Sequence, residues 1–294
     1  MYITLDIGGT KCRIASFSGS SKDSLIKIKL VQIINQWDTD FNNIVGEIFN
    51  LTGGKKITAL AIGIAGVLSK DKASLSNAVH LSSWQNINLK DSFGIKFSCQ
   101  VFIENDTFMA GFGEAYYGKI KKDFLYINWG TGVGGCLVNF YQDYLPKNKY
   151  FKDSGGVKDN NLFEIRATEL GHQVIVKSGV KCSCGQSGCL DAYVGGNGIE
   201  VVYKKKAIDL NQKEWCEVVE RFALGIMNAV VVYPVEYVVM GGGIALNQFE
   251  KIKHLEEIIN KKLKVIPPPK IQLASLNDYA GLYGGLAYIK VNDL

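Results

Sequence analysis

Residues 2–11 read YITLDIGGTK, and residues 124–135 read FLYINWGTGVGG. In each stretch a short apolar run, typical of a strand, passes directly into glycines and a threonine. Such a loop exposes backbone amides and a hydroxyl to which an anion can come close, so both loops are candidate phosphate sites. Neither has the GxxxxGK[ST] or GxGxxG consensus, and a plain β-hairpin turn is the alternative for the first loop. Two such units about 120 residues apart predict a protein of two related halves that face each other across a nucleotide.

The other segments alternate between strand and helix patterns, which predicts an α/β protein. An almost continuous apolar run at residues 57–64 has the pattern of a strand buried on both faces, and residues 38–52 repeat with a helical period. The polar residues 69–97 predict a long surface loop that carries His80, which we expect to be an exposed loop histidine, with a catalytic role as the alternative. Further strands are expected at residues 100–104 and 237–240, and further helices at residues 107–117, 214–233, 249–265 and 278–291.

Composition excludes several classes of protein. With 294 residues, 47% of them hydrophobic, the chain is long enough for two domains that each bury a core. No apolar window of eighteen residues exists, and the first residues form a strand pattern instead of an export signal, so we expect a cytoplasmic protein without membrane contact. The net charge of +5 comes from scattered lysines, which favours solvated helix faces over a nucleic-acid surface. Seven cysteines without an export signal fit a reducing compartment.

A cysteine-rich stretch, residues 169–191, reads ELGHQVIVKSGVKCSCGQSGCLD. One imidazole and three thiolates within eighteen residues make a complete tetrahedral ligand set for Zn²⁺, and glycines between the cysteines allow the tight turns that such a site needs. Because four protein ligands leave no position for a reacting water, the predicted zinc is structural. Incidental cysteines beside an exposed histidine are the alternative. The predicted ligands are His172, Cys182, Cys184 and Cys189.

Two carboxylates lie at the ends of predicted strands. Asp6 precedes the first glycine loop, where it could hold a hydrated Mg²⁺ beside phosphates. Asp106 follows the strand at residues 100–104, where it could cap the next helix, accept the proton of a substrate hydroxyl, or do both. Asn105 beside it could fix the group that is presented to the base.

The ordered set of motifs resembles the ROK family of sugar kinases, of the bacterial glucokinase and N-acetylmannosamine kinase type. The matching motifs are DIGGTK at 6–11, END at 104–106, GTGVGG at 130–135, ELGH at 169–172 and CSCGQSGCLD at 182–191. The resemblance spans nearly the whole chain and implies the two-domain actin/hexokinase/Hsp70-like (ribonuclease H-like) fold with a central cleft. It implies a smaller domain of residues 1–105 plus 280–294 and a larger domain of residues 106–279 that carries the zinc-binding loop.

The resemblance implies ATP-dependent phosphorylation of the 6-hydroxyl of a hexose or N-acylhexosamine, such as glucose or N-acetylmannosamine, with Asp106 as the general base. It implies ATP, Mg²⁺ and structural Zn²⁺ as cofactors, a small-molecule sugar and no nucleic acid or membrane as partner, and a homodimer by analogy. The implied nucleotide residues are Asp6, Gly8, Gly9, Thr10, Lys11, Gly130, Thr131, Gly132, Gly241, Gly242 and Gly243. The implied sugar-binding residues are Gly66, Asn105, Asp106, Glu169, His172 and Asp191.

Several positions depart from the family pattern and bear on the identity of the sugar. Asp191 stands where glutamate is usual and is one methylene shorter, so its contact with the anomeric hydroxyl is expected to change or to run through water. Thr168 stands where a small apolar residue is common, and residues 147–160 read as a lengthened loop. Val67 and Leu68 follow Gly66 where proline is common, and bulkier residues than usual follow Asp106.

Other functions stay open within the resemblance. A non-catalytic sugar or nucleotide sensor would typically lack the base or a phosphate loop, whereas Asp106 and both loops are present. A repressor would need a helix-turn-helix ahead of the first strand, and we expect none because the chain begins at that strand. A kinase for another sugar, such as fructose or allose, is a further alternative.

Overall fold

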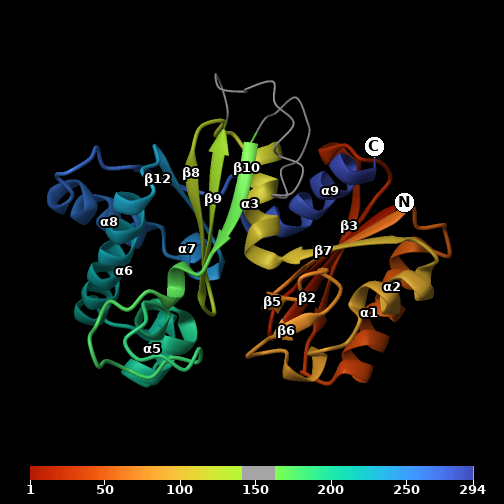
Figure 1. The fold of residues 1–294 in the computed structure, drawn as a ribbon, viewed down its shortest axis with the longest axis horizontal. Coiled ribbons are helices and arrows are strands. Elements are labelled where there is room, and N and C mark those ends of the chain that lie inside the picture. Colours follow the sequence, from red (N-terminus) through yellow and green to blue (C-terminus); the bar gives the residue numbers. More distant parts are fainter. Residues whose placement is uncertain (141–162, 294) are drawn as a thin grey trace. The chain divides into compact units, whose positions relative to one another are not determined.

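The computed structural model describes residues 1–140 and 163–293, and Figure 1 traces their fold. The long loop that the sequence predicts at residues 147–160 lies outside the described residues. Contacts divide the described chain into two units: residues 1–120 and 279–293 form unit 1, and residues 121–140 and 164–278 form unit 2. Among these described residues, no helix combines the length and the apolar character needed to cross a membrane.

Unit 1 is built on a five-stranded sheet in the order β3-β2-β1-β4-β7. β1 pairs antiparallel with β2, and β4 and β7 continue the sheet in parallel. The strands are β1 Tyr2–Ile7, β2 Lys11–Phe17, β3 Leu25–Gln32, β4 Ala59–Ile64 and β7 Gln100–Asn105, with a small hairpin of β5 Val67–Leu68 and β6 Leu75–Asn77. The helices are α1 Trp37–Thr52, α2 Leu89–Phe97, α3 Asp106–Tyr117 and α9 Ala280–Asp293.

Alternation along β1 sends its side chains into two cores. Ile3 and Leu5 pack with Ile44 and Ile48 of α1 on one face of the sheet. Thr4 lies on the other face, where Gly285 of α9 comes so close that an added Cβ would stand 3.1 Å from the Cβ of Thr4. The last helix therefore packs closely on the sheet formed by the first hundred residues, because it has a glycine where it meets Thr4.

Unit 2 repeats the plan of unit 1, with a sheet in the order β10-β9-β8-β11-β12. Again the first strand and the next form an antiparallel hairpin, and two parallel strands follow. The strands are β8 Phe124–Trp129, β9 Val133–Phe140, β10 Phe163–Thr168, β11 Tyr237–Gly241 and β12 Lys270–Leu273. The helices are α4 Asp191–Val194, α5 Gly196–Tyr203, α6 Gln212–Val232, α7 Gly243–Asn247 and α8 Phe249–Lys262. The equivalent strand orders confirm the prediction of two related α/β halves.

The domain limits differ in one place from those expected. The sequence places a boundary after residue 105, whereas α3 belongs to unit 1 by its contacts. The physical reason is the packing of α3 on α9: an added Cβ on Gly113 would stand 2.4 Å from the carbonyl oxygen of Ala280. Unit 1 therefore continues to residue 120.

The expectation of a long surface loop at residues 69–97 is wrong. This stretch contains β6, which pairs with β5 just ahead of it, the 3₁₀ turn Ser82–Trp84 and α2. The side chain of Trp84 is fully buried, and its indole Nε1 donates to Oδ2 of the buried Asp40 at 3.3 Å. A few buried apolar side chains among polar residues therefore hold this stretch against the core. Because they do not repeat with a clear period, the sequence pattern does not reveal them.

Candidate functional site

The carboxyl ends of three parallel strands meet at one edge of the sheet in unit 1. Ile7 of β1 pairs with Ile64 of β4, and Ile64 pairs with Asn105 of β7. The first glycine loop, Gly66 and Asp106 follow these three residues within two positions. Ligands of α/β proteins bind beyond such strand ends, so the predicted base and the first phosphate loop share an edge suited to substrate binding.

Asn105 caps α3, and Asp106 is the first residue of this helix. The side-chain oxygen of Asn105 accepts hydrogen bonds from the backbone N–H groups of Thr107 and Phe108 at 3.0 and 3.1 Å. Its Nδ2 donates to the carbonyl oxygen of Gly66 at 3.3 Å. Of the roles that the sequence leaves open for Asp106, the helix cap belongs instead to Asn105. Asp106 still accepts from the N–H of Thr107 through Oδ1 at 2.7 Å, which orients its carboxylate.

The first glycine loop is a hairpin turn between β1 and β2, closed by a bond from the N–H of Gly8 to the carbonyl oxygen of Lys11 at 2.9 Å. Asp6 stands at the base of the turn, and its Oδ2 lies 3.4 Å from Nη1 of Arg13. The exposed Lys11 begins β2. The loop is therefore a hairpin turn. This does not conflict with the phosphate-loop prediction, because the glycines of the turn still let an anion come close to the backbone.

His80 is a neighbour of this loop that sequence reasoning did not identify. An added Cβ on Gly9 would stand 2.5 Å from Cβ and 3.1 Å from Cγ of His80, so the histidine packs directly on the glycine. The imidazole is exposed, as expected, but it lies on the candidate phosphate loop. The histidine can come this close only because position 9 has no Cβ. In the sequence, the glycine pair of the hairpin is the only local feature that indicates such a contact.

Two glycine segments of unit 2 lie side by side. The loop of residues 130–132 follows β8, and residues 241–243 lead from the last residue of β11, the parallel neighbour of β8, to the first residue of α7. An added Cβ on Gly130 would stand 3.7 Å from the backbone nitrogen of Gly243. Gly130 and Thr131 also accept hydrogen bonds through their carbonyl oxygens from the N–H groups of Gly196 and Asn197 at 2.9 and 3.0 Å. The predicted nucleotide residues of unit 2 thus form one surface.

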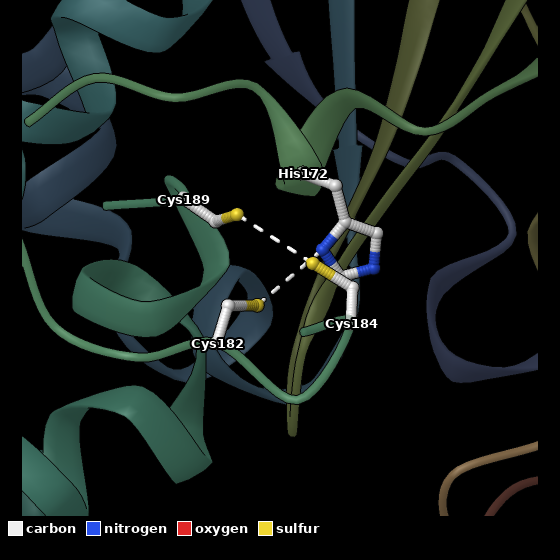
Figure 2. A group of neighbouring side chains, drawn as sticks. All are labelled: His172, Cys182, Cys184 and Cys189. Carbon is white, nitrogen blue, oxygen red and sulfur yellow. Dashed lines mark hydrogen bonds between the residues drawn. The ribbon is translucent and has the colours of Figure 1, made fainter. Parts of the chain in front are cut away.

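The four predicted metal ligands come together in unit 2, as Figure 2 shows. Their ligand atoms all lie within 4.8 Å of one another. Sγ of Cys182 is 3.5 Å from Nδ1 of His172, and Sγ of Cys184 is 3.7 Å from Sγ of Cys189. A zinc ion bound about 2.3 Å from sulfur and about 2.0 Å from nitrogen in a tetrahedron would separate its ligand atoms by roughly 3.5–3.8 Å. Donor set and spacing therefore fit a four-coordinate zinc.

Two glycines make the turns of this cluster, as predicted. Gly185 has φ of 94° and Gly188 has φ of 84°, values in the left-handed region that glycine favours. A Cβ at position 188 would also stand 1.8 Å from the carbonyl oxygen of Val176. Burial raises the pKa of the Cys189 thiol to about 12, whereas a backbone hydrogen bond at Gln186 lowers the pKa of Cys184. A bound cation would reverse the rise at Cys189, because coordination stabilises the thiolate.

Glu169 and His172 belong to one 3₁₀ turn, in which the N–H of His172 donates to the carbonyl oxygen of Glu169 at 2.9 Å. Because Nδ1 of His172 faces the cysteines, its Nε2 lies on the other side of the ring, 3.9 Å from Oε2 of Glu169. The Glu169 side chain is 77% exposed. The metal cluster thus holds one ring nitrogen, and the other is presented beside a solvent-accessible carboxylate.

Thr168 is a further departure from the expected pattern. Its Oγ1 is buried without a hydrogen-bond partner among the described residues, and an added Cβ on Gly135 would stand 2.8 Å from it. The hydroxyl lies at the end of β10, directly before Glu169, at a position where an apolar side chain would fit. No polar contact with the described part of the chain compensates for its burial.

Comparison with known proteins places these features in a family. A model described as the ROK family matches residues 2–144 and 155–291. The xylose repressor of Caldicellulosiruptor bescii is 25% identical over 268 residues, which cover 80% of this chain and 63% of the repressor. The glucokinase of Streptomyces coelicolor is 27% identical over 209 residues, 70% of this chain and 60% of that enzyme. The chain thus spans less than two thirds of the length of these two relatives.

Other relatives match over nearly their full length. The N-acetyl-D-glucosamine kinase of Vibrio cholerae is 27% identical over an alignment 309 positions long, which covers 97% of this chain and 98% of that kinase. The crystal structure of a ROK family glucokinase from Streptomyces griseus in complex with glucose and AMPPNP has a TM-score of 0.74 and 20% identity, and covers 100% of this chain and 99% of that one. This likeness confirms the predicted actin/hexokinase-like fold. Because the family model matches most of the sequence, the chain belongs to the ROK family.

Proposed function

We propose that the protein is an ATP-dependent sugar kinase that transfers the γ-phosphoryl group to the 6-hydroxyl of a hexose or N-acylhexosamine. The observation that carries this proposal is the edge of unit 1 at which the glycine loop, Gly66 and the oriented carboxylate of Asp106 stand side by side. Phosphoryl transfer requires mainly that the attacking oxygen and the phosphate be positioned and that developing charge be neutralised, and this edge offers groups for both tasks.

Asp106 acts as the general base. Its carboxylate accepts the proton of the sugar hydroxyl as the oxygen attacks phosphorus. The bond from the N–H of Thr107 to Oδ1 at 2.7 Å holds the carboxylate in one orientation, so little reorganisation is needed when the hydroxyl arrives. Asn105 supports the same geometry, since its side chain joins the helix start to the peptide of Gly66.

The glycine segments bind the nucleotide. Backbone amides at Gly9, Thr131 and Gly132, together with the hydroxyls of Thr10 and Thr131, offer donors to phosphate oxygens. Gly8 and Gly130 shape the two loops, because their N–H groups donate to the carbonyl oxygens of Lys11 and Gly132. Lys11 adds positive charge, and residues 241–243 lie where they can contact the nucleoside, next to the loop at Gly130. Mg²⁺, when bound, neutralises phosphate charge, and the carboxylate of Asp6 is suited to hold it through water.

The sugar hydroxyls bind to Gly66, Asn105, Asp106, Glu169 and His172. The orientation of the imidazole supports this role for His172, because a ligand on Nδ1 fixes the proton on Nε2 and makes that nitrogen a donor. Glu169 supplies an exposed acceptor from the same turn. The family resemblance implies Asp191 as well, but its Oδ1 accepts from the N–H of Val133 at 2.7 Å, so we assign its main contact to the neighbouring glycine loop.

The zinc is structural in this proposal. His172, Cys182, Cys184 and Cys189 would hold it, and four protein ligands leave no position for a water nucleophile. By holding the ion, these residues would fix the 3₁₀ turn that carries Glu169 and the imidazole of His172. The charge of the three thiolates also requires a cation, because three sulfurs this close would otherwise repel one another once ionised.

A second candidate is a protein that binds sugar and nucleotide without turnover, as part of a regulator. The relative that favours it is the xylose repressor, with 25% identity over 80% of this chain. The oriented Asp106 carboxylate supports the kinase instead, since a sensor has no need of a base.

A coupled assay of ADP release separates the two candidates. Purified protein with ATP and Mg²⁺ is offered glucose, mannose, fructose, allose, N-acetylglucosamine and N-acetylmannosamine. A kinase releases ADP in proportion to at least one sugar, and the phosphorylated product identifies the substrate. If calorimetry detects sugar and nucleotide binding but no sugar releases ADP, the sensor is correct and the kinase is rejected.

A further inference from the structure

Val133, the first residue of β9 and part of the second glycine motif at residues 130–135, is held from two sides by motifs distant in the sequence. Its N–H donates to Oδ1 of Asp191 at 2.7 Å. On its carbonyl side it meets Gly171 of the ELGH motif, where an added Cβ would stand 2.2 Å from the carbonyl oxygen of Val133. The residue that ends the cysteine motif and the residue before His172 therefore contact the two successive peptide groups on either side of the Val133 Cα.

The segment after Asp191 continues this attachment. The N–H groups of Gly196 and Asn197 donate to the carbonyl oxygens of Gly130 and Thr131 at 2.9 and 3.0 Å. Nε1 of Trp129, at the start of the loop, donates to the carbonyl oxygen of Val194 at 2.7 Å. Residues 129–133 are thus bonded along their length to residues 191–197, and Asp191 contributes the side-chain bond at the far end.

The surroundings of Asp191 suit a short carboxylate. Added Cβ atoms on Gly132 and Gly195 would stand 2.9 and 2.7 Å from Oδ1 of Asp191, so both glycines are in close contact with this oxygen. A glutamate, which is one methylene longer, could not keep its oxygen on the N–H of Val133 without moving one of these backbones. The aspartate at this position therefore matches the loop that it contacts.

We propose that Asp191 is a positioning residue of the nucleotide site: its carboxylate holds the loop of residues 130–135 in the conformation that binds phosphate. The inference rests on the proposed kinase function for the identity of the ligand, but its structural part, the order of the loop, does not. Removing the acceptor leaves the buried N–H of Val133 without a partner, which favours another loop conformation. Nucleotide affinity then falls, whereas sugar affinity changes less.

The test compares variants at position 191 by two readouts. D191L has nearly the shape of aspartate without an acceptor, D191N keeps an oxygen that can accept from the N–H of Val133, and D191E keeps the charge on a longer chain. D209L, at an exposed aspartate of the same unit, is the control for the substitution itself. Calorimetric titration with the ATP analogue AMPPNP and Mg²⁺, and separately with the preferred sugar, measures binding without turnover. Hydrogen–deuterium exchange of residues 129–135 measures the order of the loop without any ligand.

We expect D191L to raise the Kd for AMPPNP about tenfold, or about 1.4 kcal/mol, and the Kd for sugar less than threefold. Exchange in residues 129–135 should accelerate in D191L, and D191N should lie between D191L and native protein in both readouts. D191E should resemble D191L, and it decides the matter if D191L does not fold.

Three results would overturn the inference: unchanged exchange in both D191L and D191E, a larger loss of sugar than of nucleotide affinity, or D209L behaving like D191L. Failure of the kinase proposal is distinguishable, because it appears in native protein as a lack of turnover or of AMPPNP binding. The exchange result for Asp191 is independent of that outcome.

Discussion

Asn105 joins the ends of two parallel strands, because its Nδ2 donates to the carbonyl oxygen of Gly66 at 3.3 Å while its Oδ1 caps α3. One amide side chain thus fixes the backbone of β4, the end of β7 and the first turn of the helix that begins with Asp106. The base is therefore placed by its neighbour as well as by its own bonds.

Substitutions at Asn105 should separate the cap from the amide donor. Asn105→Ala removes both and should lower the free energy of unfolding by about 1 kcal/mol, the usual effect of losing a cap. Asn105→Asp keeps an acceptor for the helix and should retain most of that stability, yet it loses the donor to Gly66, so both variants should raise the KM for sugar. Urea unfolding and steady-state kinetics measure the two effects. Equal stability losses in the two variants would contradict the capping role.

Asp106→Asn tests the base. The amide oxygen can still accept from the N–H of Thr107, so the fold and sugar binding should stay close to native, but the proton acceptor is lost. We expect kcat to fall by at least about a hundredfold. The coupled ADP assay and sugar titration check this. Asp38→Asn, at an exposed aspartate in the first turn of α1, is the matched control and should leave kcat unchanged. A kcat within a few-fold of native in Asp106→Asn would remove Asp106 as the base.

The metal prediction concerns both the zinc content of the protein and its kinase activity. Native protein should contain about one zinc per chain, and chelation or Cys184→Ser should remove it, lower the melting temperature and abolish phosphorylation. Atomic emission and thermal unfolding provide the measurements. Cys216→Ser, outside the cluster and on α6, should change neither zinc content nor activity. Full activity in a metal-free sample would show that the cluster does not need a cation.

Gly9 and His80 permit a rescue experiment. Gly9→Ala would place a Cβ 2.5 Å from Cβ of His80, closer than real atoms allow, so the loop must shift. We expect a higher KM for ATP and a lower melting temperature. His80→Gly in the Gly9→Ala background removes the clashing atom and should restore both, whereas His80→Ala keeps that atom and should not. Gly46→Ala in α1, where no atom lies within 4 Å of the added Cβ, should be neutral or slightly stabilising. Rescue by His80→Ala would place the clash elsewhere.

The sequence predicts those parts of the fold and the site that depend on neighbours along the chain. β1 begins and ends where its apolar run does, and α1 begins one residue earlier than expected. The sulfur cluster was predictable because its ligands fall within eighteen residues and glycines occupy the turns. Local pattern does not distinguish between two adjacent residues that suit the same role. Asn105 and Asp106 could both cap the helix, and in the structure the cap is Asn105, which also bonds to Gly66.

What could not be predicted depends on contacts between distant segments. Trp84 reads as a loop residue until Asp40 supplies an acceptor for its indole. The packing of His80 on Gly9 and the bond from Val133 to Asp191 join segments that no periodicity connects. The same limit applies to Asp191, where the sequence records a shorter side chain but not the two glycines that make room for it.

The position of α9 in the chain also has a consequence for synthesis. This helix covers Thr4 and Ala61 of the first sheet, yet a ribosome must make all of unit 2 before it makes α9. Until α9 is made, nascent unit 1 therefore has only α3 on this face of the sheet, and the part that α9 covers stays exposed. Unit 1 can thus complete its core only after unit 2 has been synthesised, which departs from the usual order in which the amino-terminal domain folds first.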